Sequence, residues 1–320
     1  MAMSISAVGM LAFGGVLSAG AFHPVSGTIV HGPISGPCAV GTKPVRPGFD
    51  PVNHYVYVPN YGSANITVLS GTCTLVGTIT LPSGSQPVSA AFDPADNEMY
   101  VTDLNLNVVY VISGTTVVST ITNTAFAALE SIIWDPGDNL MLITDAYADA
   151  VFAISGTAVI GNVSVGSSPF GICYDPYYNV IVVTNQLSYN ITLLNAYSPL
   201  SAPVGNVLLG STTPYGCAYD VADHSDYIIT GNNVTVMSGS GHILATIPVG
   251  KAPQGIAWDQ AKLEIYVTNG IAGTISVISG TSVVKTIKGV ATLPGGLAYD
   301  EVNDRMYVAA FSSGIVYIVA

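Results

Sequence analysis

The sequence contains few charged residues. Only 8% of its 320 residues are charged, against roughly 25% in an ordinary soluble protein. Seven Lys and Arg stand against 19 Asp and Glu, so the net charge is −12 at pH 7. The cations are scattered and form no basic stripe, which excludes nucleic acid as a partner. With 49% hydrophobic residues the chain is not disordered, and its composition argues against a cytosolic enzyme.

The cysteines lack the spacing of metal-binding or redox motifs. Cys38, Cys73, Cys173 and Cys217 are 35, 100 and 44 residues apart, so the chain has no Cys-x-x-Cys pair. Cys38 and Cys73 both flank the first repeat unit and are candidates for a disulfide in an oxidising compartment. Cys173 and Cys217 lie in apolar strand patterns, and their positions within the repeat differ by one residue. We therefore expect two inert buried thiols that face opposite sides of their strands.

Long apolar runs are missing beyond the N-terminus. Residues 1–22 contain no Lys, Arg, Asp or Glu, and their apolar run ends in Ala19-Gly20-Ala21. This pattern predicts a signal peptide or an apolar arm for residues 1–22, with an uncleaved membrane anchor as an alternative. Residues 23–320 are expected to form one domain without further membrane contact. A signal peptide or an anchor would place that domain in the extracellular medium or at the cell surface.

Helical periodicity is also absent, and a repeat takes its place. An aromatic residue followed by Asp recurs seven times, with spacings of 43, 42, 40, 45, 39 and 41 residues. In six of the seven units a proline stands six residues before the Asp. The pairs are Phe49-Asp50, Phe92-Asp93, Trp134-Asp135, Tyr174-Asp175, Tyr219-Asp220, Trp258-Asp259 and Tyr299-Asp300. Because the Asp is present in every unit, we interpret it as structural, bonding the amides of the turn that follows.

Each unit contains four short runs of strand-forming residues. A β-branched and aromatic run such as Ile265-Tyr266-Val267-Thr268 follows the turn, and Ser-Gly pairs such as Ser279-Gly280 mark the hairpin between the third and fourth runs. Four antiparallel strands every 39 to 45 residues are typical of a β-propeller blade. The sequence therefore predicts an all-β, seven-bladed β-propeller.

The two ends of the chain predict how the ring closes. The last unit has a second strand near 305–309 and a third near 315–319, and the chain stops before a fourth. Residues 26 to about 36 copy the start of a fourth strand, since Ser26-Gly27-Thr28 matches Ser279-Gly280-Thr281. We expect this N-terminal segment to pair with residues 315–319 and to complete the last blade, which would hide its open edge.

The repeat resembles the YVTN family of β-propeller repeats. The resemblance lies in Tyr266-Val267-Thr268-Asn269, in the run from Pro253 to Asp259 and in Ile275-Ser276-Val277-Ile278, and it covers residues 26–320. It implies an extracellular protein, since the family is known from archaeal surface-layer proteins. The fold is shared with lactonases, a streptogramin lyase and haem or copper reductase domains, so the resemblance says little about chemistry.

Four Asn-x-Ser/Thr sequons occur, and three of them start the third strand of their unit. Either they are glycosylated, or Asn and Thr simply suit that turn. The candidate glycosylation sites are Asn65, Asn162, Asn190 and Asn233.

Ligand-binding candidates come from the loops expected around the central axis. The residue after each repeat proline should point there, and these positions differ from blade to blade. The candidates for ligand binding at the channel mouth are Arg46, Glu130, Phe170, Tyr215 and Gln254. Phe170 and Tyr215 either form an aromatic wall for a sugar or peptide, or fill the mouth of the channel.

Three acidic residues on the same expected face form a candidate metal site. Asp103 and Asp145 end second strands, and Glu130 lies in the neighbouring loop. Carboxylates of this kind suit Ca²⁺. The alternative, which we favour, is that these acids cap loop amides.

Residues for catalysis are scarce. The five histidines are predicted on different blades or in the N-terminal segment, and no Cys-x-x-Cys-His haem site exists. We therefore expect an exported, surface-layer-like binding or structural module without catalysis or cofactor. Its partner would be a protein or glycan at the cell surface, or a second copy of the chain. The alternative is a Ca²⁺- or other divalent-metal-dependent enzyme, lactonase-like or lyase-like, with its site at the channel mouth.

Overall fold

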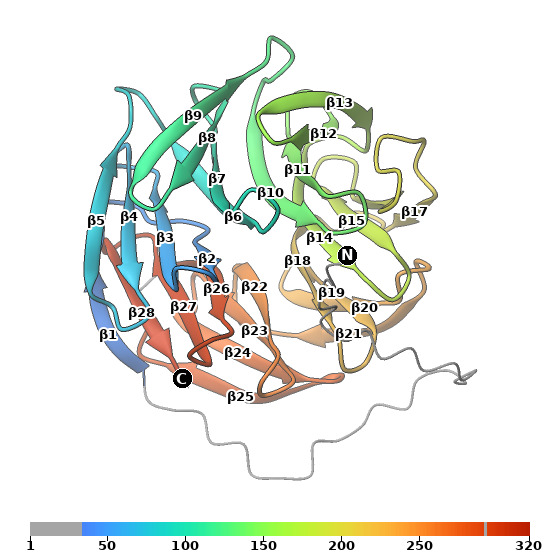
Figure 1. Cartoon of the computed structure of the whole chain (residues 1–320). Helices are drawn as coiled ribbons and strands as arrows, with labels where there is room; N and C mark the ends of the chain where they lie inside the picture. The colour runs from blue at the N-terminus through green and yellow to red at the C-terminus, as the bar shows by residue number, and fades with distance from the viewer. Residues whose placement is uncertain (1–33, 291–292) are drawn as a thin grey trace, which may run out of the picture.

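The structure is a computed structural model that describes residues 34–290 and 293–320, and the predicted signal peptide lies outside this range. In these described residues, twenty-eight strands form seven four-stranded antiparallel sheets arranged in a ring (Figure 1). The prediction of a seven-bladed propeller is confirmed. Within the described residues no helix is long and apolar enough to cross a membrane.

Six blades follow chain order from the axis to the rim. Blade 1 holds β2 (Gly48–Asp50), β3 (Tyr55–Asn60), β4 (Asn65–Ser70) and β5 (Leu75–Thr80), and blade 2 holds β6 (Pro87–Asp93), β7 (Glu98–Asp103), β8 (Val108–Ser113) and β9 (Thr116–Thr122). Blade 3 holds β10 (Leu129–Asp135), β11 (Leu140–Asp145), β12 (Ala150–Ser155) and β13 (Ala158–Ser164), and blade 4 holds β14 (Pro169–Asp175), β15 (Val180–Asn185), β16 (Asn190–Asn195) and β17 (Gly205–Leu208). Blade 5 holds β18 (Pro214–Asp220), β19 (Ser225–Thr230), β20 (Asn233–Met237) and β21 (Ile243–Pro248), and blade 6 holds β22 (Pro253–Asp259), β23 (Glu264–Asn269), β24 (Thr274–Ser279) and β25 (Ser282–Lys288).

Blade 7 joins the two ends of the chain. It holds β26 (Pro294–Asp300), β27 (Arg305–Ala310) and β28 (Ile315–Val319), and β1 (Ile34–Ala39) is its outermost strand, pairing with β28 (Figure 1). The predicted closure by an N-terminal strand is confirmed. Within the described residues the strand covers 34–39, so it continues three residues beyond the predicted end near residue 36. Residues 26–33 lie outside the described residues.

The repeated Asp ends the first strand of each blade and caps the turn that follows. In blade 4 the Oδ1 atom of Asp175 accepts the amide hydrogens of Tyr177 and Tyr178 at 2.8 and 2.9 Å. Asp50 does the same in blade 1, with the amides of Val52 and Asn53 at 2.9 and 3.2 Å. A carboxylate that accepts two backbone amides fixes the turn. The structural role predicted for this residue is confirmed.

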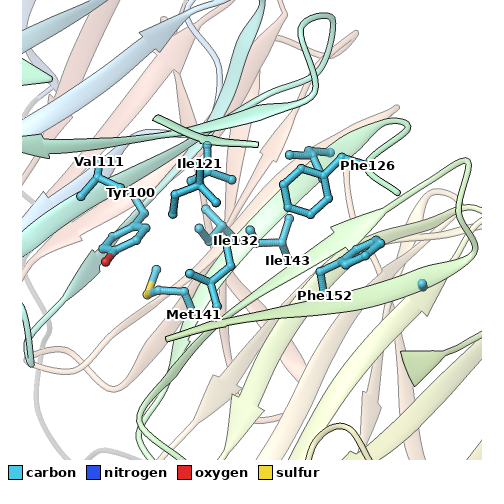
Figure 2. Close-up of a cluster of buried hydrophobic side chains, with 12 residues drawn as sticks. Tyr100, Val111, Ile121, Phe126, Ile132, Met141, Ile143 and Phe152 are labelled. Carbon is cyan, nitrogen blue, oxygen red and sulfur yellow. The ribbon is translucent and has the colours of Figure 1, made fainter. Parts of the chain in front are cut away.

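The hydrophobic core lies between neighbouring blades. Figure 2 shows one such layer, in which Tyr100 and Val111 of blade 2 pack against Ile143 and Phe152 of blade 3. In blades 1, 2 and 5 the second-strand tyrosine also reaches the next blade. The Tyr100 hydroxyl, for example, donates to the carbonyl of Gly156 at 3.0 Å. Blades therefore stack face to back, which is how a ring of sheets buries both faces of each blade.

Two disulfides each tie one blade to the next. Cys38 in β1 bonds Cys73 in blade 1, with Cα atoms 5.5 Å apart, which anchors the closing strand. Cys173 in β14 bonds Cys217 in β18, with Cα atoms 5.9 Å apart. The expectation of two inert thiols is therefore wrong. Because neighbouring blades stack face to back, side chains that point to opposite sides of equivalent strands in adjacent blades point toward each other.

Candidate functional site

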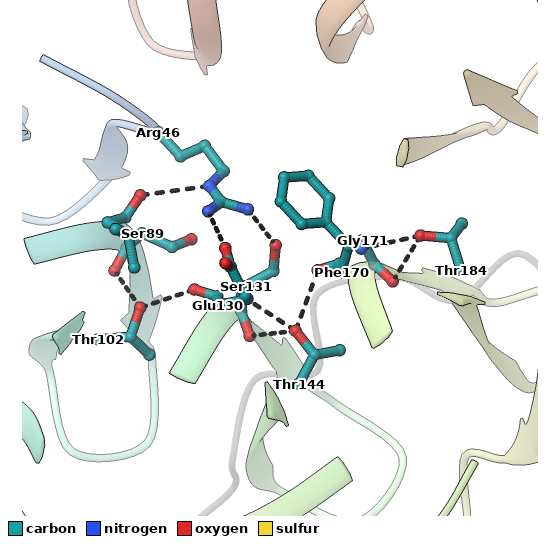
Figure 3. Close-up of polar contacts among 10 residues, drawn as sticks. Arg46, Ser89, Thr102, Glu130, Ser131, Thr144, Phe170, Gly171 and Thr184 are labelled. Carbon is teal, nitrogen blue, oxygen red and sulfur yellow. Dashed lines mark hydrogen bonds and ion pairs between the residues drawn. The ribbon is translucent and has the colours of Figure 1, made fainter. Parts of the chain in front are cut away.

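We call the face that carries the turns between second and third strands, and the loops between blades, the upper face. The opposite face, with the turns between first and second strands, is the lower face. The threonine of the second strand positions the residues around the axis of the upper face. The hydroxyl of Thr102 donates to the carbonyl of Glu130 at 2.8 Å, and that of Thr144 to the carbonyl of Phe170 at 3.0 Å (Figure 3). Thr184 bonds the carbonyl of Tyr215 in the same way. Each acceptor belongs to the next blade, so these bonds hold neighbouring blades in register.

Arg46 is the centre of a polar and aromatic cluster on the upper face. Its Nη2 lies 2.6 Å from Oε2 of Glu130, its Nη1 donates to Oγ of Ser131 at 2.8 Å, and its Nε donates to the carbonyl of Val88 at 3.2 Å. The guanidinium carbon also lies 4.6 Å from the ring centroid of Phe170 (Figure 3). Charge-assisted hydrogen bonds and cation–π contacts of this kind are favourable for arginine.

The mouth cluster, defined here as Arg46, Glu130, Ser131, Phe170 and Tyr215, extends over blades 1, 3, 4 and 5. The edge of one ring meets the face of the other between Phe170 and Tyr215, with centroids 6.1 Å apart at 87°. The structure thus brings together four of the five residues predicted at the channel mouth. The charge of Arg46 is already matched by Glu130, so an anionic ligand would have to displace that carboxylate.

The fifth predicted residue, Gln254, lies beside Tyr215 in a separate pocket between blades 5 and 6. The pocket has a volume of about 420 Å³. Its lining residues are Ser211, Thr212, Thr213, Tyr215, Gly231, Asn232, Ala252, Pro253 and Gln254. Tyr215 is therefore shared by the pocket and the mouth cluster.

The three acids of the candidate metal site are not brought together. Oxygens of Asp145 accept four backbone amides, those of Ala127, Ala128, Tyr147 and Ala148, at 2.7 to 3.2 Å. In the part of the chain that the structure describes, no three His, Cys, Asp or Glu side chains are placed to hold a metal ion.

Asp103 is occupied in the same way as Asp145. Its carboxylate accepts the amides of Gln86, Asn105 and Leu106 at 2.8 to 3.1 Å. Glu130 is paired with Arg46. The shared Ca²⁺ site of Asp103, Glu130 and Asp145 is therefore corrected to two amide-capping aspartates and one ion pair, and the capping interpretation holds for both aspartates.

Exposed apolar side chains lie on the upper face, at positions outside the predicted ligand and metal sites. Tyr147, Leu187 and Ile271 are 82%, 69% and 68% exposed. Each occupies the second position of the four-residue turn between second and third strands, in blades 3, 4 and 6. The sequence signal that could have identified them is an apolar residue in a turn that normally contains polar residues. We call these three residues the apolar crown.

The lower face holds a group of acids between blades 4 and 5, which we call the lower junction. It consists of Asp175, Asp220, Asp223 and Asp226, with His224 among them. Asp226 is fully buried, and neither of its oxygens has a hydrogen-bond partner. Burial and the charges of Asp175 and Asp223 raise the pKa of Asp226 well above its usual value, and burial with Asp223 raises the pKa of Asp220 to about 7.

The candidate glycosylation sites differ in accessibility. Asn65, Asn190 and Asn233 start the third strands β4, β16 and β20, as expected. Asn190 is 8% exposed, and its Nδ2 donates to Oδ1 of Asn206 at 2.7 Å. Asn162 lies on the outer strand β13 and is exposed. The geometry therefore favours attachment at Asn162 and disfavours it at Asn190.

Comparisons with known proteins agree with the fold. A streptogramin B lyase matches with a TM-score of 0.77 and 12% identity, covering 90% of this chain and 97% of that chain. A hydrazine synthase of Kuenenia stuttgartiensis matches at 0.76 and 14%, covering 92% and 98%, and a virginiamycin B lyase from Staphylococcus aureus at 0.76 and 15%, covering 90% and 99%. No family model matches the chain, and no curated protein matches it in sequence. At these identities the similarity shows the fold alone.

Proposed function

We propose that the chain is an exported, surface-layer-like propeller that binds its partner through the upper face, without catalysis. The observation that carries this proposal is the apolar crown, because Tyr147, Leu187 and Ile271 expose more than two thirds of their surface on turns around one face. Large apolar side chains with such high exposure at equivalent turns of one face are typical of interaction surfaces. The partner is a protein or glycan at the cell surface, or a second copy of the chain.

The disulfides support an extracellular location. Both join neighbouring blades, and disulfides persist mainly in oxidising compartments. The resemblance to YVTN repeats and the apolar residues 1–22 point in the same direction. The low proportion of charged residues also suits a protein exposed to a variable medium, since few surface charges limit repulsion when the pH changes.

The test replaces the apolar crown with serine, in the variant Tyr147→Ser, Leu187→Ser, Ile271→Ser. The matched control replaces three exposed valines of lower-face turns, Val52, Val221 and Val302, with serine. Binding is measured by cosedimentation with isolated envelopes of the producing cells, and self-association by analytical ultracentrifugation. The crown variant should bind or self-associate at least roughly tenfold more weakly, while the control behaves as wild type. Equal behaviour of the two variants in both assays would contradict the proposal.

The alternative function is a divalent-metal-dependent enzyme, lactonase-like or lyase-like. Glu130 at the mouth cluster is the one member of the candidate metal set whose carboxylate does not cap backbone amides. Calorimetric titration of the chelator-treated protein with Ca²⁺ separates the two functions. A stoichiometric site that is lost in Glu130→Ala would favour the enzyme, and absence of binding would leave the binding module as the proposal.

A further inference from the structure

Blade 5 has a shorter upper turn than its neighbours, and this opens the upper face beside blade 6. Only Gly231 and Asn232 separate β19 from β20, whereas four residues separate the corresponding strands in each of the other six blades. Gly231 has φ of 60°, a conformation that glycine adopts without strain. Two missing residues remove the side chains that would otherwise cover the loop from Ser211 to Thr213.

The contact between blades 5 and 6 is also weaker at this point. The fifth residue of β19 is Ile229, where blades 2, 3, 4 and 6 have the threonine that bonds the next blade. Ile229 has no hydroxyl to donate to the carbonyl of Gln254. The shortened turn and the missing threonine together explain why the pocket of about 420 Å³ lies at this junction.

Hydrogen bonds fix the walls of the pocket, including the side chain of Asn232, and leave most of the other polar side chains without a partner in the part of the chain that the structure describes. The amide of Gly231 donates to the carbonyl of Thr213 at 3.1 Å, and the amide of Ala252 donates to Oδ1 of Asn232 at 3.0 Å. In contrast, within the described residues the side chains of Ser211, Thr213 and Gln254 form no hydrogen bond. The Thr212 hydroxyl and the Tyr215 hydroxyl are likewise without a hydrogen-bond partner there.

The chemistry of these groups indicates the ligand. The lining offers several hydroxyls and amides and no charged side chain. Such a lining cannot compensate a phosphate or carboxylate, and the net charge of −12 repels anions further. A ligand with many hydroxyls can satisfy several of these donors and acceptors at once. Tyr215, held edge-on by Phe170, adds an aromatic surface against which the C–H face of a sugar ring can pack.

We propose that the pocket between blades 5 and 6 binds one unit of a neutral saccharide, with Thr213 and Gln254 as hydrogen-bonding residues and Tyr215 as the aromatic wall. This inference rests on the proposed function, because it assigns a ligand class to the same upper face. A volume of about 420 Å³ lies within the roughly 300–1,000 Å³ typical of small-molecule sites.

The experiment is saturation-transfer NMR on the full chain with methyl glycosides of glucose, mannose and galactose, and with N-acetylglucosamine. At least one should bind with a dissociation constant of the order of 1 mM, the affinity expected for a ligand of about a dozen heavy atoms. Glucuronic acid should bind at least roughly tenfold more weakly, because the pocket has no cation. Binding should persist in EDTA, which separates this site from a metal-dependent one.

Three variants locate the binding. Thr213→Val keeps the side-chain shape but removes the hydroxyl, and Gln254→Ala removes an exposed amide, so each should weaken binding roughly fivefold to tenfold. Tyr215→Ala should abolish saturation transfer. Gln186→Ala, on the upper face of blade 4 but outside the pocket, is the matched control and should bind as wild type. Circular dichroism melts show which variants are folded. If Tyr215→Ala does not fold, Thr213→Val and Gln254→Ala still test the site.

The outcomes separate this inference from the proposed function. If no neutral sugar binds, or if Thr213→Val and Gln254→Ala bind like wild type, the saccharide site is wrong, whatever the envelope assay shows. If the sugars bind while the crown variant still sediments with envelopes like its control, the saccharide site stands and the crown proposal fails. A glycan source is distinguished from a free sugar by comparing methyl glucoside with dextran per glucose unit. Dextran binds if the pocket accepts a unit within a chain, and it does not bind if the pocket accepts only a free sugar.

Discussion

The mouth cluster with its neighbouring aspartates and the lower junction contain the same residue type in opposite environments. On the upper face, Asp103 accepts three backbone amides and Asp145 accepts four. At the lower junction, Asp226 is fully buried with both oxygens unpartnered, and one oxygen each of Asp175 and Asp223 has no partner. A buried carboxylate stabilises a fold when amides solvate its charge, and it destabilises the fold when nothing does.

The buried carboxyls of the lower face should make the stability of the fold depend on pH. The carboxyls of the lower face hold protons more tightly in the folded chain, since burial raises the pKa of Asp220 to about 7 and that of Asp135 to about 6. These carboxyls of the lower face should therefore stabilise the fold more in acid than at neutral pH.

The largest expected effect on stability comes from removing the disulfide that joins blades 4 and 5. The Cys173–Cys217 disulfide joins the two strands whose ends carry Asp175 and Asp220, and it closes a loop with a sequence separation of 44. The variant Cys173→Ser, Cys217→Ser should lower the free energy of unfolding by about 4 kcal/mol, from chain entropy. Chemical denaturation measures this loss. A loss below about 1 kcal/mol would mean that packing alone holds the lower junction together.

Removing an upper aspartate should have the next largest effect. Asp145→Ala leaves four amides without their acceptor, and we expect a loss of about 3 kcal/mol in the free energy of unfolding. The control is Asn123→Ala, in the loop between blades 2 and 3, where the side-chain Oδ1 accepts the amide of Ala125 at 2.8 Å in an exposed position. Similar losses in the two variants would refute the idea that burial makes the capping bonds of Asp145 valuable.

The pH dependence of the whole protein should reflect the lower face. The folded pKa values of Asp135 and Asp220, about 6 and 7, exceed the value of about 4 expected in the unfolded chain. The folded state thus binds more protons between these values, so stability is fully present near pH 4 and is lost as the pH rises through 6 and 7. We expect Tm to fall by roughly 5 °C between pH 5 and pH 8. Calorimetry at both pH values measures this change, and a Tm that rises from pH 5 to pH 8 would contradict the prediction.

The smallest expected effect is an increase in the free energy of unfolding. Asp226→Asn replaces the unpartnered carboxyl of the lower junction with a neutral group of the same shape. At pH 8 it should raise the free energy of unfolding by roughly 1 kcal/mol, because no buried charge has to form beside Asp175 and Asp223. At pH 4 the gain should disappear, since the wild-type carboxyl is protonated there. Urea denaturation at the two pH values measures the difference, and a loss of stability at pH 8 would show that Asp226 has a partner when ionised.

Much of the fold could be predicted from the sequence because each blade is folded by local signals. The aromatic-Asp pairs and Ser-Gly turns give the number of blades, and the Asp175 and Asp50 caps behave as expected. The short spacing of 39 residues between Asp220 and Asp259 also belongs to the blade whose upper turn is shortened. That spacing was the available signal for the pocket beside Gln254.

The sequence by itself determined seven blades of four strands, since the blade count depends on patterns within about 40 residues. The unfinished last unit also predicted closure by an N-terminal strand, but not the bounds of that strand. Only the tertiary structure decided which residues of different blades meet. Cys173 meets Cys217 because blades stack face to back, and Arg46 meets Glu130, 84 residues away, because the ring brings blades 1 and 3 to one axis. Whether an acid caps amides, as Asp145 does, or lies unpartnered, as Asp226 does, depends on loops that the repeat pattern does not specify.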